Sequence, residues 1–417
     1  MAADVVGRRA STLMLLVLLT AGAAGAADRD RLLFHAETLD GRVLSSRGAD
    51  KLFNPASLVK VGTSLWALDR LGPDHRYRTV FGVKGSWDRS AGLVDGSLVV
   101  IGGGDPDFQV ENVFMVAREL NRLGLRKVEG WLRIDGTFWI GWENGVAHRL
   151  TQPRDRMELM GRRLRAALDP DRWDTTTRAA WESCCARRGW DPARPPRVEV
   201  IGRVWPGAPD GWTPLVTHRS NPLGTLLKRF NAFSNNDIVR VAEVLGGPAA
   251  LEVFLAEKLG AAPGTVQLST ASGEQRNRLT ARAAVDLLRE FRLATVEHGL
   301  TPRDLLPAVG CAPGPTRRMF PGLAAPATTG SVVVKTGTLT TTDGGVAVVA
   351  GFFESPTLGE IMFCIAAPRA GGQIQHWRSL EQGWLLDLIA TAGGAVQAPC
   401  GPELPFSDSL AEVAPVY

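Results

Sequence analysis

FNPASLVK, residues 53–60, places a serine and a lysine three positions apart at the start of an apolar helical pattern that runs to Leu71. Pro55 suits a helix start, because its missing N–H would have no partner there. On such a helix Ser57 and Lys60 share one face, so their side chains can meet. A serine hydroxyl becomes a nucleophile when a neighbouring base takes its proton, and a lysine can be that base once its pKa is lowered.

Two further motifs follow in a fixed order. Residues 234–236 read SNN, and residues 335–338 read KTGT after a strand-like VVV. Serine-x-x-lysine, serine-x-asparagine and lysine-threonine-glycine together are the signature of penicillin-binding proteins and class A β-lactamases. Each motif alone can be explained by a structural role without catalysis. These roles are a capped helix, a polar loop that interrupts a helix, and a turn that ends a strand.

The motif residues predict a division of roles. Asn236 could hydrogen-bond both Lys60 and a substrate amide, and Ser234 could relay a proton to a departing amine. Lys335 could lower the pKa of Lys60 and hold a substrate carboxylate. A peptide could add to the strand edge, with the N–H groups of Ser57 and Thr338 as an oxyanion hole. The predicted catalytic residues are Ser57, Lys60, Ser234 and Asn236, and the predicted substrate-binding residues are Lys335, Thr336, Gly337 and Thr338.

The resemblance extends beyond the motifs. The segments 71–74 (LGPD), 100–106 (VIGGGDP) and 277–280 (NRLT) resemble the class C penicillin-binding proteins, the serine D-alanyl-D-alanine carboxypeptidase/endopeptidase family, peptidase S13. The resemblance spans about residues 31–390 and is weakest over 145–212. It implies that Ser57 is acylated, that Lys60 is the base, and that Lys335, Thr336 and Thr338 bind the terminal carboxylate.

The resemblance also implies an α+β fold: a penicillin-binding transpeptidase/β-lactamase-like domain with a mixed, mainly antiparallel sheet flanked by helices, and an inserted α/β region. We expect a signal peptide over 1–27 and a discontinuous catalytic domain over 28–82 and 213–395. The inserted accessory region then covers 83–212, and 396–417 is a loosely held tail.

Local patterns predict the elements themselves. We expect a hairpin over 31–46, strands over 78–101 and 128–135, and helices over 111–124 and 150–190. The segment 222–246 is helical with an interruption at 233–236, and another helix covers 280–292. Strands are expected at 331–336, 345–353 and 360–367, and a closing helix at 375–392.

Two segments depart from the family. The family usually has Asp-Gly-Ser-Gly where this chain has Thr270-Ala271-Ser272-Gly273, so an acidic side chain is missing. Residues 313–316 read PGPT where Asp-Gly-Thr-Leu is common. These departures bear on substrate preference and leave the three motifs intact.

The first 27 residues have the three-part layout of a secretory signal peptide. Arg8 and Arg9 precede an apolar run at 13–19, and small residues with an AGA triplet follow. The alternatives are an uncleaved anchor or a buried helix. The layout predicts secretion across the inner membrane to a periplasmic or other extracytoplasmic place of action.

Composition sets further limits. Hydrophobic residues make up 45% of the chain and charged residues 22%, with a formal net charge of +4, which is too mild to indicate nucleic-acid binding. The five cysteines fit no zinc pattern, and we expect neither metal nor cofactor. A disulfide is compatible with secretion, but its connectivity stays open, and small buried thiols are the favoured interpretation.

Residues 150–190 are rich in arginine, and eight of the twelve tryptophans fall between positions 131 and 212. The favoured interpretations are a solvated helix face and core packing. The alternatives are contact with anionic glycans or lipid head groups, which includes peripheral membrane contact, and stacking on sugars.

The leading hypothesis is a serine DD-peptidase that hydrolyses the D-Ala-D-Ala bond of peptidoglycan stem peptides and is acylated by β-lactam antibiotics. The balance of carboxypeptidase and endopeptidase activity, and the oligomeric state, stay open. The alternatives are a β-lactamase or esterase-like hydrolase, and a non-hydrolytic peptidoglycan-binding protein that keeps the fold.

Overall fold

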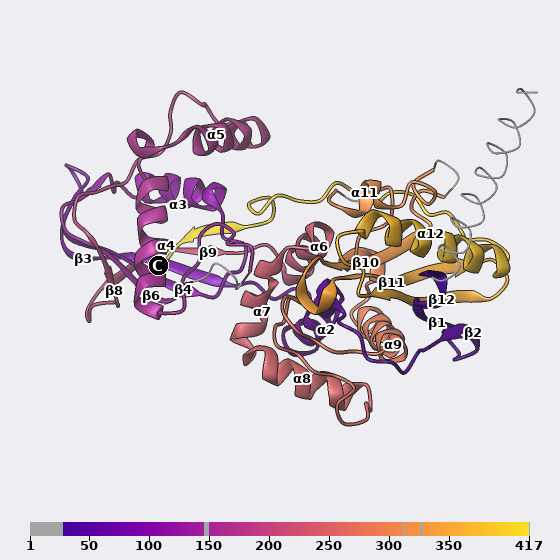
Figure 1. Cartoon of the computed structure of the whole chain (residues 1–417). Coiled ribbons are helices and arrows are strands. Elements are labelled where there is room, and N and C mark those ends of the chain that lie inside the picture. The colour runs from indigo at the N-terminus through magenta and orange to yellow at the C-terminus, as the bar shows by residue number, and fades with distance from the viewer. Residues whose placement is uncertain (1–27, 146–149, 312, 326–327, 417) are drawn as a thin grey trace, which may run out of the picture.

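The computed structural model describes residues 28–145, 150–311, 313–325 and 328–416. They form two lobes, each built on a sheet of its own (Figure 1). We call the lobe with the five-stranded sheet the main lobe and the lobe with the eight-stranded sheet the accessory lobe. The predicted signal peptide lies outside the described residues. Of the helices in the described ranges, none combines the length and the apolar character needed to cross a bilayer.

The main sheet is antiparallel throughout and has the order β10-β11-β12-β1-β2. Its strands are β1 (Leu33–Thr38), β2 (Val43–Arg47), β10 (Val332–Leu339), β11 (Val346–Ser355) and β12 (Gly359–Pro368). The predicted N-terminal hairpin and the three late strands are therefore confirmed. Strand β10, which carries the KTGT motif, lies at one edge of this sheet.

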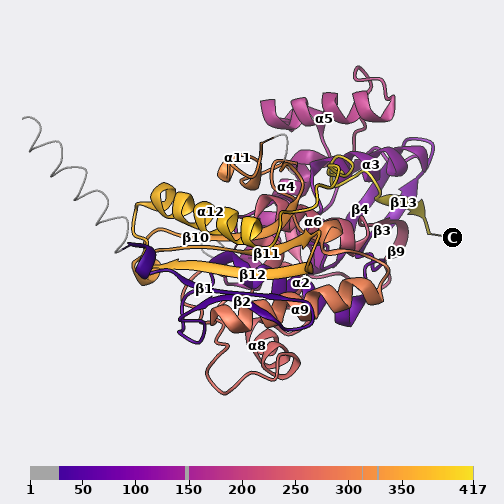
Figure 2. The same cartoon turned by 90° about the vertical axis from the view of Figure 1, so that its right-hand side faces the viewer.

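Helices cover both faces of the main sheet (Figure 2). Val332 and Val334 pack into the core under α12 (Ile374–Thr391), whereas Val333 between them packs into the core shared with α2 (Val59–Leu71) and α9 (Ala281–Glu297). Because side chains alternate across a strand, a run of apolar residues is what a strand buried on both faces requires.

The remaining main-lobe helices are α6 (Leu223–Phe233), α7 (Val239–Val244), α8 (Gly247–Lys258), α10 (Pro302–Leu305) and α11 (Thr316–Met319). Of these, α6, α7 and α8 pack against α2, α10 packs against α6 and α9, and α11 lies on the α12 side of the sheet. The predicted interruption of the 222–246 helix is the short turn between α6 and α7. Helix α8 is missing from the sequence-based expectations, because its apolar side chains are spread around the helix instead of forming one stripe.

The accessory sheet is mixed. Strands β13, β9, β3 and β4 pair antiparallel, and β4 then pairs in parallel with β5 and β6, which continue to β7 and β8. The bounds are β3 (Arg78–Asp88), β4 (Leu93–Gly103), β5 (Lys127–Val128), β6 (Leu132–Thr137), β7 (Glu199–Val200), β8 (Val204–Pro206), β9 (Thr213–Arg219) and β13 (Glu412–Pro415).

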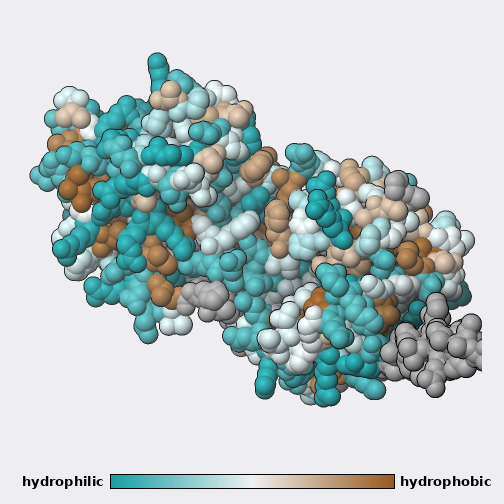
Figure 3. All heavy atoms as spheres, turned by 45° about the horizontal axis from the view of Figure 1, so that its top comes forward, coloured by the Kyte–Doolittle hydropathy of each residue, from teal (hydrophilic) through white to brown (hydrophobic). Residues whose placement is uncertain are grey.

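Three helices complete the accessory lobe: α3 (Val110–Arg122), α4 (Pro153–Ala167) and α5 (Thr175–Arg188). The tryptophans of this lobe range from buried to exposed. Trp139, Trp173 and Trp181 are buried in the lobe, as core packing predicts, whereas Trp131 and Trp205 are exposed. The surface of both lobes is mostly hydrophilic, with separate apolar patches (Figure 3).

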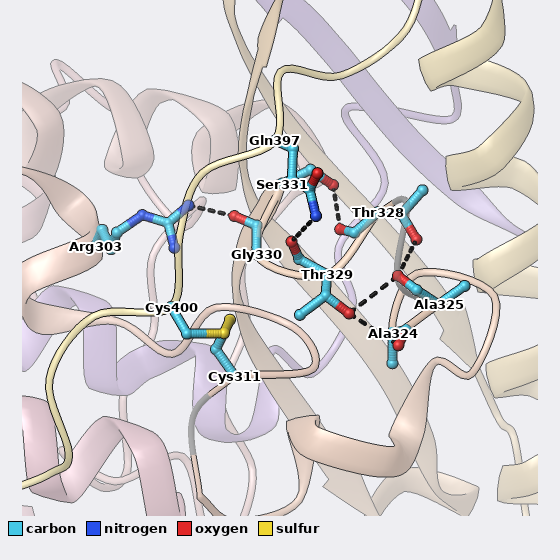
Figure 4. The surroundings of a disulfide bond; sticks show 10 residues. All are labelled: Arg303, Cys311, Ala324, Ala325, Thr328, Thr329, Gly330, Ser331, Gln397 and Cys400. Atoms are coloured by element: carbon cyan, nitrogen blue, oxygen red, sulfur yellow. Dashed lines mark hydrogen bonds between the residues drawn. A yellow bond between two sulfur atoms is a disulfide. The ribbon is translucent and has the colours of Figure 1, made fainter.

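The segment after residue 396 is not loosely held, and this corrects the expectation from its lack of periodicity. A disulfide joins Cys400 to Cys311 of the main lobe (Figure 4). The buried carboxylate of Asp408 then pairs with Arg187 and Arg188 of α5, and β13 adds to the accessory sheet. The segment is ordered by partners that are remote in sequence, which periodicity cannot reveal.

The other domain borders predicted from the sequence differ slightly from the sheets. The border between residues 82 and 83 falls inside β3, which belongs to the accessory sheet from Arg78 onward, and the border between 212 and 213 falls directly before β9, which belongs to the same sheet. A strand pattern does not say which sheet the strand joins, so neither border could be placed more closely from the sequence.

Candidate active site

Ser57 lies in a single turn of 3-10 helix, Ala56–Leu58, directly before α2. Ala56 adopts a φ of 46°, an unusual conformation for a residue with a side chain. Asn54 supports the turn: its Oδ1 accepts from the Ala56 N–H at 3.1 Å, and its Nδ2 donates to Gln275 O at 2.8 Å. The strained backbone is therefore held by neighbours on both sides, which is common where a reactive side chain must be presented.

Two glycines let the backbone close around this turn. A Cβ at Gly273 would lie 1.8 Å from Ala56 O and 2.8 Å from Ser57 N, and a Cβ at Gly337 would lie 2.7 Å from Pro55 O. Neither position has room for a side chain. The third motif and the 270–273 segment thus both contact the Ser57 turn directly.

Lys60 is fully buried beneath Ser57. Its Nζ lies 2.8 Å from Ser57 Oγ, 2.7 Å from Asn236 Oδ1 and 2.6 Å from the Ser272 carbonyl oxygen. Burial lowers the pKa of Lys60 to about 7, against an opposing effect of the Glu274 carboxylate. A substantial neutral fraction is therefore present near neutral pH.

The second motif reaches the site from the end of α6. Ser234 adopts a left-handed conformation that ends this helix, and its Oγ accepts a hydrogen bond from Lys335 Nζ at 2.9 Å. Asn236 contacts Lys60, so the two members of the motif engage the two lysines separately.

Lys335 is almost completely buried, and its Nζ also donates to Thr336 O at 2.8 Å. Burial, together with the nearby Lys60 and Arg378, keeps the pKa of Lys335 well below its usual value. Arg378, on α12, donates to Gly337 O at 2.6 Å and to Thr338 Oγ1 at 2.7 Å, and pairs with the buried Glu381 at 2.6 Å. It fixes the motif strand from behind.

The outer edge of β10 is half covered. The Val334 N–H donates outward to Pro307 O, and Val332 O accepts from the Val309 N–H. Because backbone groups alternate between the two sides of an antiparallel strand, the N–H groups of Thr336 and Thr338 point to this same edge. The part of the edge beside Ser57 can therefore receive an extended peptide.

The accessory lobe contacts the second motif through Asp237, which follows Asn236. Its buried carboxylate accepts hydrogen bonds from the backbone N–H groups of Glu143, Asn144 and Gly145, at 2.7, 3.1 and 3.2 Å. Arg240, also fully buried, lies 3.4 Å from the same carboxylate. A Cβ at Gly145 would meet Asn236 and Glu274, so this accessory loop lies directly against the site.

The structure brings all eight predicted residues to one place. Sequence reasoning missed Arg378, Asp237, Glu274 and the Ser272 carbonyl. Glu274 could have been noticed, because it lies one position after the 270–273 segment in which the family's acidic residue is missing. At that missing position, the Thr270 hydroxyl bonds the Gly273 N–H at 3.1 Å and Glu274 O at 2.7 Å, and so orders the loop.

Comparison with known proteins follows the same residues. The model of the D-Ala-D-Ala carboxypeptidase 3 (S13) family matches residues 33–149 and 198–372, well over half of the chain. The unmatched segment between them falls in the part where the resemblance is weakest. The D-alanyl-D-alanine carboxypeptidase of Actinomadura sp. (strain R39) is 33% identical over 103 residues, which make up 25% of this chain and 19% of that protein.

Solved structures share the fold. The predatory endopeptidase Bd3459 of Bdellovibrio bacteriovorus has a TM-score of 0.72 at 22% identity, over 91% of this chain and 98% of that one. Penicillin-binding protein 4 of Haemophilus influenzae has a TM-score of 0.60 at 17% identity, over 86% and 99%. The expected penicillin-binding fold, with its mixed and antiparallel sheets flanked by helices, is thereby confirmed. The family match, carried across both lobes and all three motifs, places this chain in the D-Ala-D-Ala carboxypeptidase S13 family.

Proposed function

We propose that this protein is a serine DD-peptidase that cleaves the D-Ala-D-Ala bond of peptidoglycan stem peptides through an acyl-enzyme on Ser57. The observation that carries the proposal is the set of three contacts of Lys60 Nζ, to Ser57, Asn236 and Ser272. Membership of the S13 family supports the substrate class.

The three contacts fit a neutral lysine. A neutral amine has two N–H groups and one lone pair. The Asn236 Oδ1 and the Ser272 carbonyl can only accept, so they take the two N–H groups. The lone pair is then directed to Ser57 Oγ, whose hydroxyl can donate to it. Lys60 is thus the general base for Ser57.

Acylation follows from this arrangement. Lys60 takes the Ser57 proton as Oγ bonds to the carbonyl carbon of the penultimate D-alanine, and the oxyanion is held by the N–H groups of Ser57 and Thr338. The C–N bond then breaks, and the departing amine takes up, by way of Ser234, the proton that Lys60 removed, which leaves Lys60 neutral again. Water hydrolyses the ester in a second step, with Lys60 again accepting the proton.

The third motif binds the substrate. Lys335, Thr336 and Thr338 bind the terminal carboxylate, and Gly337 leaves room for the Ser57 turn on the face of the strand opposite to Arg378. Asn236 holds the substrate amide and so sets the peptide in register with β10.

Covalent labelling tests the proposal. Bd3459 of Bdellovibrio bacteriovorus has been solved in a penicillin G-acylated form, which supports the same outcome here. Incubation with penicillin G should add one adduct on Ser57, detected by mass spectrometry of the peptide, and Ser57→Ala should abolish both the adduct and D-alanine release. The proposal is wrong if the folded wild-type protein gains no adduct.

The same experiment separates the alternatives. Rapid drug turnover without a persistent adduct would indicate a β-lactamase or esterase-like hydrolase. Wall binding that survives Ser57→Ala, in a protein without peptidase activity, would indicate a non-hydrolytic binding protein. Assays on a cross-linked dimer and on a free pentapeptide measure endopeptidase and carboxypeptidase activity. We propose that this activity lies outside the cytoplasm, because a signal peptide is predicted and the proposed substrate belongs to the cell wall.

A further inference from the structure

The accessory lobe has an arginine-lined hollow between α4 and the segment that leads into β8. Both elements lie far from α2, which follows Ser57 (Figure 1). The volume of the hollow is about 420 Å³. The charged side chains that line it are Arg162, Arg165, Arg172, Arg203 and Glu158. Four guanidinium groups from three separate segments thus converge with one carboxylate. Such an excess of positive charge favours an anionic ligand.

Some of these arginines are held in place by neighbouring groups, but the positive charge of the hollow is only partly neutralised. Arg165 donates to Gly202 O at 2.7 Å, and Arg172 donates to Asp169 at 3.1 Å. Arg203 has neither a hydrogen bond nor an ion pair from its side chain within the residues that the structure describes. Burial and the neighbouring Arg172 lower the pKa of Arg165, which is the expected direction where cations are crowded.

Trp131 and Trp205 form an exposed aromatic pair at β8, on the face of this strand opposite to Val204, which lines the hollow. Their rings are stacked at 5.3 Å with an angle of 17°, and the two residues are 46% and 45% exposed. Large aromatic side chains usually lie inside, so two flat rings held together in solvent mark a surface for contact. The apolar faces of sugar rings are flat enough to stack on such a pair.

Arg154 connects the tryptophan pair to the hollow. Its guanidinium lies 5.8 Å from the Trp205 ring centroid, and its Nε donates at 3.3 Å to Glu158. Glu158 in turn lies 3.9 Å from Arg162. Arg154, Glu158 and Arg162 therefore link the aromatic pair to the hollow around the edge strand β8, an arrangement that suits a polymer with sugar faces and acid groups.

We propose that the hollow and the Trp131–Trp205 pair form a binding site for an anionic polysaccharide. The acid groups of the polymer bind Arg162 and Arg203, and the sugar rings stack on the tryptophans. The site is independent of the Ser57 chemistry, and it would hold the protein on an acidic glycan while the main lobe acts on peptides.

Binding measurements on the full protein test the site. The probes are a hyaluronate decasaccharide, a neutral N-acetylglucosamine hexamer, inorganic polyphosphate and phosphatidylglycerol vesicles, followed by calorimetry and tryptophan fluorescence. The variants are Arg203→Glu and Trp205→Ala. The matched control is Arg194→Glu, the same charge change at a side chain of the same lobe that is 86% exposed and paired with Asp191. Thermal melting checks that every variant is folded.

We expect hyaluronate to bind at least tenfold more tightly than the neutral hexamer, with the fluorescence changed. Arg203→Glu and Trp205→Ala should each weaken this binding at least tenfold, and Arg194→Glu less than twofold. The proposal is overturned if no probe binds, or if polyphosphate binds equally well and is indifferent to Trp205→Ala, which would indicate a bare anion site. It is also overturned if vesicles bind and hyaluronate does not, which would indicate a membrane surface.

Discussion

The two lobes bury their sheets differently. In the main sheet, β10 and β11 are buried along almost their whole length on both faces, whereas β3 and β4 of the accessory sheet are buried only in part, with many exposed or half-buried residues. A strand enclosed on both faces has little freedom to shift, which suits a site whose atoms must be held to fractions of an ångström. A sheet with one open face has surface left for contacts. The difference predicts that changes in the main lobe affect chemistry and that changes in the accessory lobe affect binding.

The largest effect is expected for Lys60→Met, which keeps a long apolar chain and removes the lone pair at Ser57. Loss of a general base should slow penicillin acylation about a thousandfold or more. The melting temperature should change little, because relief from burying the amine offsets the loss of its hydrogen bonds to Asn236 and Ser272. Stopped-flow acylation measures the rate, and Arg194→Ala in the accessory lobe serves as control. An acylation rate of Lys60→Met within tenfold of the wild-type rate would contradict the assignment of the chemistry to the main lobe.

Asp237→Ala tests the junction of the two lobes. It removes the acceptor of three backbone N–H groups and leaves the buried Arg240 with one carboxylate fewer. Breaking a buried ion pair costs about 3–5 kcal/mol, so the melting temperature should drop clearly. The acylation rate should also fall, because Asn236 precedes Asp237. Asp237→Asn, which keeps the shape and one acceptor oxygen, should lose less; equal losses would contradict the role given to the hydrogen bonds.

The double variant Cys311→Ser/Cys400→Ser removes the disulfide that anchors the segment after residue 396. Closing a loop of 89 residues stabilises a folded protein by about 2–4 kcal/mol in typical cases. We expect a lower melting temperature, an earlier exposure of the accessory core to proteolysis, and acylation of Ser57 retained at low temperature. A reducing agent should lower the melting temperature of the wild type and leave that of the double variant unchanged. If it lowers both, its effect does not come from this disulfide.

The smallest effect concerns pH. With the pKa of Lys60 at about 7, the acylation rate should rise through pH 7 as Lys60 loses its proton. The Glu274 carboxylate favours the charged lysine, so Glu274→Gln should lower the pKa of Lys60 and move the acidic limb of the profile to lower pH. Below pH 7 this variant should acylate severalfold faster than wild type. Glu274→Asp keeps the negative charge and should keep the pH dependence of the acylation rate. A shift of the acidic limb to higher pH in Glu274→Gln would contradict the predicted direction of the change in the pKa of Lys60.

Prediction from sequence succeeded where the signal is local. Ser57 and Lys60 meet because they are one helical turn apart, and the hairpin at 33–47 and the strand before Lys335 follow from short patterns. Asp237 and Arg378 could not be predicted, because their partners lie on elements remote in sequence. The disulfide partner of Cys400 was equally open, and β13 was missed because four residues paired with a distant strand carry no periodicity.

The accessory sheet has a consequence for the order of assembly. Strand β9 is flanked by β3 and by β13, and β13 comes after the whole of the main sheet along the chain. As the chain is made from its N-terminus, the outer edge of β9 has to wait, unpaired, until nearly two hundred further residues have been added. The accessory lobe is therefore finished last, after the strands of the main sheet are all made, and a ribosome stalled after α12 would leave an open strand edge on the accessory lobe beside a main sheet whose strands are all present.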